Sequence, residues 1–177
     1  MEYRKLGNSD LNVSRICLGC MGFGDAKTGQ HSWTVDEETS RSIIKRALDL
    51  GINFFDTALV YNGDVSEQHI ERVLKDYAKR ALKDFAKRED VVVATKFLPR
   101  TPQEIADGVT GQQHIEKSLD LSLKHLGMDY VDLYIYHMWD YQTPIYDVLS
   151  GLTKAVKAGK VRYIGIANCY AWQLAKA

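Results

Sequence analysis

Four residues whose side chains handle protons follow short apolar runs in this chain: a carboxylate, a phenol, an amine and an imidazole. Asp56, Lys96 and His137 each end such a run, and Tyr61 follows Asp56 by five residues. If the runs are neighbouring parallel strands about 4.8 Å apart, the three side chains open at one edge of the sheet. The loop that carries Tyr61 can then fold over that edge. The spacing therefore predicts an acid–base site assembled from three strand ends.

Taken singly, each of these residues has an ordinary structural interpretation. A lysine after a strand is usually a solvated strand end, and His137 alone fits a histidine packed at a rim. Tyr61 alone fits a loop aromatic, and Asp56 could cap the following turn. Their joint placement at one edge favours the acid–base interpretation.

Composition limits the classes of protein to consider. The 177 residues, 45% of them hydrophobic, suffice for one domain with a real core. Because 23 basic residues balance 23 acidic ones, neither nucleic acid nor an anionic membrane is expected as a partner. There is no run of 18 apolar residues and no apolar stretch behind the N-terminus, so neither a membrane span nor a signal peptide is expected. The sequence is typical of a cytoplasmic protein.

Cysteine and histidine usage gives no metal site. Cys17, Cys20 and Cys169 are an odd number, which suits a reducing compartment better than a disulfide framework. Cys17 and Cys20 have redox or metal spacing but no second pair, so ordinary strand and rim cysteines are favoured. The five histidines contain no pair at i, i+4, and no metal is expected.

Two periodicities alternate along the chain, one of short apolar runs and one of helical spacing. The apolar runs predict strands at 16–19, 52–56, 91–96, 130–136 and 161–168. Helices are predicted after a capping box at 34–37, after a cap at Ser66, over 112–126, after the cap and proline Thr143-Pro144, and over 171–177. Glycines 51, 127 and 159 end three of these helices.

Continuous apolar strands separated by helices indicate a parallel sheet covered by helices. An open doubly wound sheet and a (β/α) barrel both satisfy this pattern. Gly19, Gly22 and Gly24 lack the Gly-x-Gly-x-x-Gly spacing of a dinucleotide fold. Chemistry at the ends of the second, third and fourth strands fits the barrel rule. A parallel (β/α) barrel of TIM type, as a single domain over residues 1–177, is therefore favoured.

Five segments together resemble the aldo-keto reductases, most of all the bacterial members related to potassium-channel β subunits. They are Leu18-Gly19-Cys20-Met21-Gly22-Phe23-Gly24, Gly51-Ile52-Asn53-Phe54-Phe55-Asp56-Thr57-Ala58, Ala94-Thr95-Lys96, Asp132-Leu133-Tyr134-Ile135-Tyr136-His137 and Gly159-Lys160-Val161-Arg162-Tyr163-Ile164-Gly165. The likeness spans nearly the whole chain in the family's order. It implies a (β/α)₈ barrel that binds NADPH in extended form and reduces aldehydes or ketones.

The resemblance assigns roles to the four residues. It implies that Tyr61 is the general acid that protonates the alkoxide formed when hydride reaches a carbonyl carbon. Lys96 as an ammonium would favour the phenolate, and Asp56 would hold Lys96 charged and oriented. His137 would aim the carbonyl oxygen and aid the proton relay.

Cofactor contacts are also implied by the resemblance. Asp56, Met21 and Gly22 match residues at the cofactor site, and Asn168 matches the residue that binds the nicotinamide carboxamide. Ala167 stands where many members have serine. The expected ligands are NADPH and a small carbonyl substrate.

An eight-residue segment occurs twice in tandem within the second predicted helix. Residues 74–81 read LKDYAKRA and residues 82–89 read LKDFAKRE. Eight residues add about 12 Å of helix and about 80° of rotation beyond two turns. Either copy could dock while the other loops out, or the helix could extend and pack elsewhere, as in a rearranged chain. A solvated extension with i, i+4 ion pairs is the simpler alternative.

The chain corresponds to the N-terminal half of the family, with about five of eight strands. An open five-stranded parallel sheet would leave two edges that need cover. A homo-oligomer or a complementing C-terminal half could supply it, and a dimer is the least demanding arrangement. Two functions follow as alternatives: an NADPH-dependent carbonyl reductase, or a catalytically inactive, self-associating half-barrel scaffold.

Overall fold

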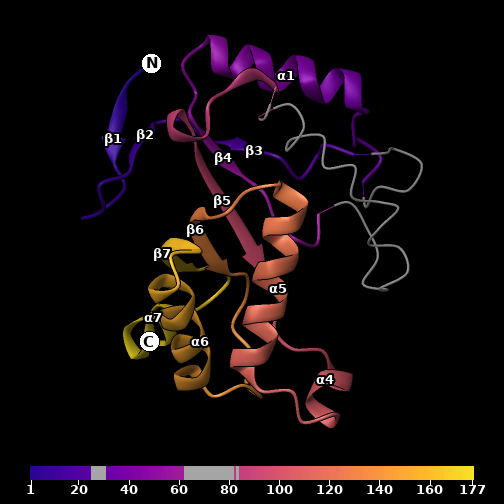
Figure 1. The fold of residues 1–177 in the computed structure, drawn as a ribbon, viewed down its shortest axis with the longest axis vertical. Helices are drawn as coiled ribbons and strands as arrows, with labels where there is room; N and C mark the ends of the chain where they lie inside the picture. Colours follow the sequence, from indigo (N-terminus) through magenta and orange to yellow (C-terminus); the bar gives the residue numbers. More distant parts are fainter. Residues whose placement is uncertain (25–30, 62–81, 83) are drawn as a thin grey trace.

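The computed structural model describes residues 1–24, 31–61, 82 and 84–177 (Figure 1). The predicted cap at Ser66 and the first copy of the tandem segment, 74–81, lie outside the described residues. Within the described part, no helix has both the length and the apolar character needed to cross a lipid bilayer.

A five-stranded parallel sheet forms the centre of the fold. The strands are β3 (Leu18–Gly19), β4 (Phe54–Asp56), β5 (Val92–Phe97), β6 (Val131–Tyr136) and β7 (Val161–Ile166). Their order in the sheet follows their order in the chain. A doubly wound sheet would reverse direction at a switch point, whereas a (β/α) barrel adds each strand beside the last. The predicted partial (β/α) barrel is confirmed.

Burial along the strands explains why their sequences read as continuous apolar runs. All six residues of β5 are buried, because this central strand has a neighbour on each side and is covered on both faces. The edge strand β7 is only partly covered, and its Ile164 is 41% exposed. The described residues therefore leave part of the apolar surface of β7 uncovered.

Two long helices cover one side of the sheet. In Figure 1, α5 (Gly111–Leu126) and α6 (Ile145–Lys157) lie side by side, and they pack against β5 and β7 respectively. Their close approach requires Gly151, because a Cβ there would lie 2.8 Å from Cδ1 of Ile115. Gly127 ends α5 in the left-handed conformation, at φ 59°, as predicted.

The remaining helices lie at the ends of the sheet. The first, α1 (Glu37–Asp49), packs Ile44 into the main core. A short helix, α4 (Pro102–Ala106), sits in the loop after β5, and α7 (Ala171–Lys176) follows β7. The α4 helix was not predicted from the sequence.

Two predicted helix caps are displaced, and in each case a hydrogen bond engages the backbone near the expected cap. The cap of α1 is Asp36, whose carboxylate accepts from the Thr39 N–H at 2.9 Å. Thr34 is not the cap, because the next residue, Val35, pairs its N–H with the Gly22 carbonyl at 2.8 Å and holds this stretch against the loop after β3.

The start of α6 is displaced in the same way. Thr143 is not its cap, because the Thr143 N–H donates to the Asp140 carboxylate at 2.6 Å. The Thr143 hydroxyl accepts from Arg100 Nε at 3.1 Å. The helix therefore begins one residue later than predicted, with Pro144 as the N-cap and Ile145 as the first helical residue.

An antiparallel hairpin, also not predicted, covers the amino ends of the strands. It comprises β1 (Tyr3–Lys5) and β2 (Asn12–Ser14). The side chain of Asn53 fixes it to β4, because Oδ1 accepts from the Ser14 N–H at 2.7 Å and Nδ2 donates to the Asn12 carbonyl at 2.9 Å.

A buried carboxylate joins several segments by hydrogen bonds at the same end of the sheet. Asp132 on β6 is 1% exposed and accepts from Arg88 at 2.6 Å, from Arg162 at 2.9 Å and from the Val93 N–H at 2.9 Å. Arg162 also donates to Asp10 in the hairpin loop at 2.8 Å. Three positively polarised groups compensate the desolvation of this carboxylate.

The described part of the second tandem copy makes contacts with the core. Leu82 is 3% exposed within the main core cluster, and Ala86 packs against that cluster. Asp84 pairs with Arg41 at 2.7 Å, and Arg88 reaches Asp132. After Phe85 the chain leaves the α-helix, and a 3₁₀ turn spans Arg88–Asp90. Residues of the second copy thus pack against the main core.

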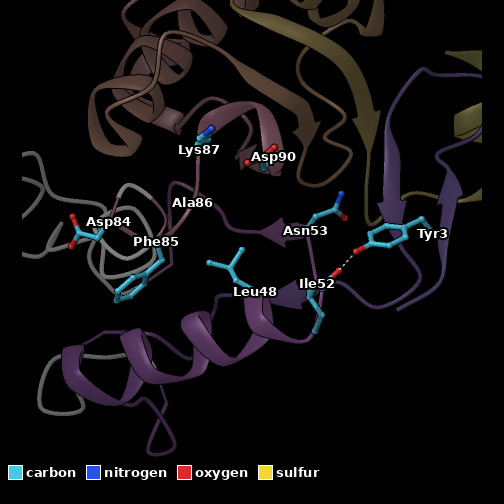
Figure 2. Close-up of a pocket in the computed structure, with 10 residues that line it drawn as sticks. Tyr3, Leu48, Ile52, Asn53, Asp84, Phe85, Ala86, Lys87 and Asp90 are labelled. Atoms are coloured by element: carbon cyan, nitrogen blue, oxygen red, sulfur yellow. Dashed lines mark hydrogen bonds between the residues drawn. The ribbon is translucent and has the colours of Figure 1, made fainter.

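The described residues also leave a cavity of about 660 Å³ at the amino end of the sheet. Leu48, Ile52 and Phe85 surround it in Figure 2. Tyr3 closes one side, where its hydroxyl donates to the Gly51 carbonyl at 2.7 Å. None of the predicted site residues lines this cavity.

Candidate active site

Three neighbouring strands carry three of the predicted site residues at their carboxyl ends. Asp56 is the last residue of β4, Lys96 is the fifth of six in β5, and His137 directly follows β6. The parallel pairing of β4 with β5 and of β5 with β6 sets these ends side by side. Tyr61 reaches them from the loop after β4. We call Asp56, Tyr61, Lys96 and His137 the tetrad.

Lys96 is the centre of the tetrad. Its Nζ lies 2.8 Å from each carboxylate oxygen of Asp56, 3.0 Å from the Thr57 carbonyl oxygen and 2.9 Å from the Tyr61 hydroxyl. An ammonium group has three hydrogens, and these three residues supply one acceptor each. The Lys96 side chain is 9% exposed, so its charge depends on these partners.

The direction of these hydrogen bonds leaves the Tyr61 proton available. The Tyr61 oxygen accepts from Lys96. Its own hydrogen therefore points away from the ammonium and can be donated to a molecule bound at the carboxyl ends of the strands. The same ammonium would stabilise the phenolate that remains after proton transfer. The arrangement can donate a proton and hold the resulting negative charge.

His137 meets Tyr61 ring edge to ring face. The ring centroids lie 6.1 Å apart with an interplanar angle of 76°. Burial and then the positive charge of Lys96 lower the pKa of His137, and the Asp56 carboxylate opposes them only in part. The imidazole is therefore neutral at neutral pH. Its buried Nδ1 has no hydrogen-bond partner within the described part of the chain.

Two neighbours of the tetrad were not singled out from the sequence. The Thr57 carbonyl binds Lys96 through the backbone, so no residue type could have indicated it. Cys17 is exposed, but its thiol also belongs to this environment, because partial desolvation and the Asp56 carboxylate, opposed by Lys96, raise its pKa. Cys17 is thus a neutral thiol, and all three cysteines are free, which is consistent with the ordinary role predicted for Cys17 and Cys20.

Asn168 lies just after β7 in the left-handed backbone conformation, at φ 49°. Asparagine tolerates this conformation better than most residues. Its side-chain Nδ2 donates to the His137 backbone carbonyl at 2.6 Å, and its backbone carbonyl accepts from the Trp139 N–H at 3.4 Å. The amide is thereby fixed beside the strand end that carries His137.

Met21 and Gly22 lie apart from Asn168. They follow β3, at one edge of the sheet, whereas Asn168 follows β7 at the other. Gly22 faces the Trp33 ring, which a Cβ would approach to 2.8 Å. In the ranges that the structure describes, no hydrogen bond or ion pair joins Met21 or Gly22 to the tetrad. The predicted cofactor residues are therefore divided between the two edges.

Comparison with known proteins identifies the family. The sequence model described as Aldo/keto reductase family matches residues 15–177. This chain belongs to the aldo-keto reductase family. The matched range includes every residue of the tetrad, together with Met21, Gly22 and Asn168.

Curated relatives align with nearly all of the chain. The aldo-keto reductase yakc of Schizosaccharomyces pombe, whose name specifies NADP(+), is 36% identical over 176 residues, which cover 98% of this chain and 47% of that protein. The oxidoreductase YrpG of Bacillus subtilis is 36% identical over 181 residues, which cover 100% and 52%. The chain spans about half the length of these relatives.

Solved aldo-keto reductase structures have the same fold. A thermostable aldo-keto reductase in complex with the inhibitor epalrestat superposes with a TM-score of 0.76 at 30% identity, over 100% of this chain and 57% of that one. An aldo-keto reductase from Bacillus halodurans in its holo form gives a TM-score of 0.75 at 30% identity, over 99% and 53%. The fold of this chain thus matches somewhat more than half of each of these aldo-keto reductase structures.

Proposed function

We propose that this chain carries the acid–base site of an NADPH-dependent reductase of aldehydes or ketones, with Tyr61 as the general acid. The observation that carries the proposal is the position of Lys96 Nζ between the Asp56 carboxylate and the Tyr61 hydroxyl. This contact leaves the Tyr61 proton free to be transferred and places a fixed positive charge beside the Tyr61 oxygen. Protonation of an alkoxide by such a group is general acid catalysis, which contributes about 10²- to 10⁴-fold to a rate.

The roles of the other two tetrad residues follow from their charges. Asp56 keeps Lys96 oriented and compensates its charge inside a poorly solvated site. A neutral His137 can donate one hydrogen bond to a carbonyl oxygen without competing with Lys96 for a negative charge. Its unpartnered buried Nδ1 fits a site that a ligand completes.

The residues at the rim fit a nicotinamide cofactor. Reduced nicotinamide supplies the hydride when it is bound. Asn168 has the amide chemistry to bind a carboxamide, and its Oδ1 has no partner among the described residues, whereas Nδ2 is used by His137. Met21 and Gly22 would contact the cofactor from the opposite edge. The cofactor named for the yakc relative supports NADPH as the choice.

A complementing C-terminal half is the partner we propose for this reductase. The edge strand β7 presents the exposed Ile164, and the exposed Trp172 and Leu174 follow on α7. The relatives are about twice as long as this chain. The same exposed apolar residues favour the second candidate function, a self-associating half-barrel without turnover.

The test measures NADPH oxidation with 4-nitrobenzaldehyde and NADPH binding by tryptophan fluorescence. Turnover that Tyr61→Phe reduces at least about 100-fold, with binding retained, supports the proposal. Tyr146→Phe is the matched control, because Tyr146 is 81% exposed on α6. Turnover unchanged in Tyr61→Phe would contradict the role of Tyr61. Absence of binding and turnover, together with a sedimenting mass of twice 20.1 kDa, would favour the scaffold.

A further inference from the structure

One buried histidine outside the tetrad contacts the loop that follows β5. His114 lies on α5 and is 9% exposed. Its Nε2 is 2.8 Å from the Leu98 carbonyl oxygen. Its Nδ1 is 3.2 Å and 3.1 Å from the two carboxylate oxygens of Glu104 on α4. Both ring nitrogens therefore have a partner from the same loop.

Both partners are acceptors, and this fixes the protonation of the ring. A carbonyl oxygen only accepts, so Nε2 must carry a hydrogen. Burial would raise the pKa of Glu104, but hydrogen bonds from Thr101 and His114 outweigh it and hold that pKa below its usual value. Glu104 is thus ionised and also only accepts. His114 keeps both contacts as an imidazolium, whereas a neutral ring, with one N–H, must give one of them up.

The Leu98 carbonyl lies two residues beyond Lys96. Between them, Phe97 is buried against the rings of Tyr134 and Tyr136, with centroid distances of 4.7 and 5.2 Å. The Phe97 carbonyl accepts from the His137 N–H at 2.9 Å. The end of β5 that His114 holds is therefore the backbone that positions Lys96 and binds His137.

The other charged groups around His114 have partners elsewhere. Arg100, in the loop after β5, donates to Thr143 and to the Val109 carbonyl. On the side of β6, Tyr136 donates to Asp140 at 2.6 Å, and burial raises the pKa of Tyr136. On α6, Asp147 accepts from the Gly111 N–H at 2.7 Å. Glu104 is the charged group that faces the imidazole.

We propose that His114 is a positioning residue for carbonyl reduction, acting as an imidazolium that joins the carboxyl end of β5 to α4 and so holds Lys96 in place. A neutral ring keeps only one of the two contacts, and the strand end is then less firmly held. The catalytic consequence rests on the proposed function, whereas the protonation state and the strand contact do not.

Two variants separate charge from packing. His114→Gln can still donate to Leu98, but it then presents its amide oxygen to the Glu104 carboxylate. In the double variant His114→Gln with Glu104→Gln, the new amide at 104 donates to that oxygen and still accepts from Thr101. The double variant keeps the hydrogen bonds and has no titrating pair. His125→Gln, on the same helix, is the matched control.

The first measurement is independent of turnover. Nitrogen NMR of the 177-residue wild type at pH 6 should show both His114 ring nitrogens protonated, and hydrogen exchange should show that the His137 amide is less protected in His114→Gln than in the wild type. The double variant should regain that protection. A singly protonated ring, or a loss of protection that persists in the double variant, would overturn the proposal.

The second measurement is the rate of carbonyl reduction. His114→Gln should lower kcat roughly 10- to 100-fold with little change in KM, because misplacement of a catalytic group costs that much. The double variant should regain most of the rate. Equal rates in wild type and His114→Gln would overturn the positioning role. An inactive wild type with the expected NMR result would instead contradict the proposed function alone.

Discussion

The Lys96 ammonium lies 2.9 Å from the Tyr61 hydroxyl oxygen, although 35 positions separate the two residues in the chain. The same nitrogen lies 2.8 Å from Asp56. One buried cation thus connects a carboxylate on β4 to a phenol in the following loop. Because Lys96 belongs to β5, the contact exists only where β4 and β5 are neighbours in parallel register. Its electrostatic influence extends to His137, which gives the first prediction.

Replacing Lys96 by methionine should raise the pKa of His137. The Lys96 charge is one of the two causes that lower this pKa, and the Asp56 carboxylate, which raises it, would remain. An NMR titration of the His137 ring measures the change. Lys154→Met is the matched control, because Lys154 pairs with Glu116 on the exposed surface of the helices. A His137 pKa that stays the same or falls in Lys96→Met would contradict the electrostatic argument.

His137 should also make the folded state less stable in mild acid. Its pKa is lower in the folded state than in the unfolded chain, so protonation favours unfolding. The contribution is fully present above the unfolded histidine value of about 6.5 and is lost as the pH falls from there to the depressed folded value.

Urea unfolding at several pH values measures this effect. The free energy of unfolding of the wild type should fall more between pH 7.5 and 5.5 than that of His137→Gln. At pH 8, where the imidazole is neutral in both states, the pH-dependent difference should be absent. Parallel slopes for the two proteins across the window would rule out His137 as the titrating group.

Leu82→Ala should lower the free energy of unfolding by about 2–5 kcal/mol, the range for truncating a buried leucine. Leu82 is 3% exposed in the main core, and it belongs to the second copy of the tandem segment. Leu50→Ala makes the same change at a leucine that is 49% exposed and should cost much less. Equal losses in chemical denaturation would contradict the role of Leu82 in the core.

Arg88→Met should destabilise the fold by up to about 3–5 kcal/mol, because it removes one partner of a buried carboxylate. Asp132 would retain only Arg162 and the Val93 N–H. Arg15→Met is the control, since Arg15 pairs with Glu2 on the surface and such pairs contribute about 0–1 kcal/mol. Similar small losses in both variants would mean that Arg162 alone compensates Asp132.

Much of the fold could be predicted from local pattern. Apolar runs of four to eight residues between helical segments indicated the five parallel strands, and Gly127 marked the end of α5 because its left-handed conformation suits glycine. The caps at Thr34 and Thr143 were wrong. In each case a non-local or turn hydrogen bond engaged the neighbouring backbone, and the helix began elsewhere.

For the site, the sequence by itself determined which residue types stand at the ends of three strands. The tertiary structure decided the rest: that Lys96 Nζ is shared among Asp56, Thr57 and Tyr61, that Leu82 of the second tandem copy lies in the core, and that Glu104 faces His114. The physical reason is that side-chain periodicity reports burial at each position. Which polar atoms meet depends instead on strand register and on the paths of the loops, and these are set by packing across the whole sheet.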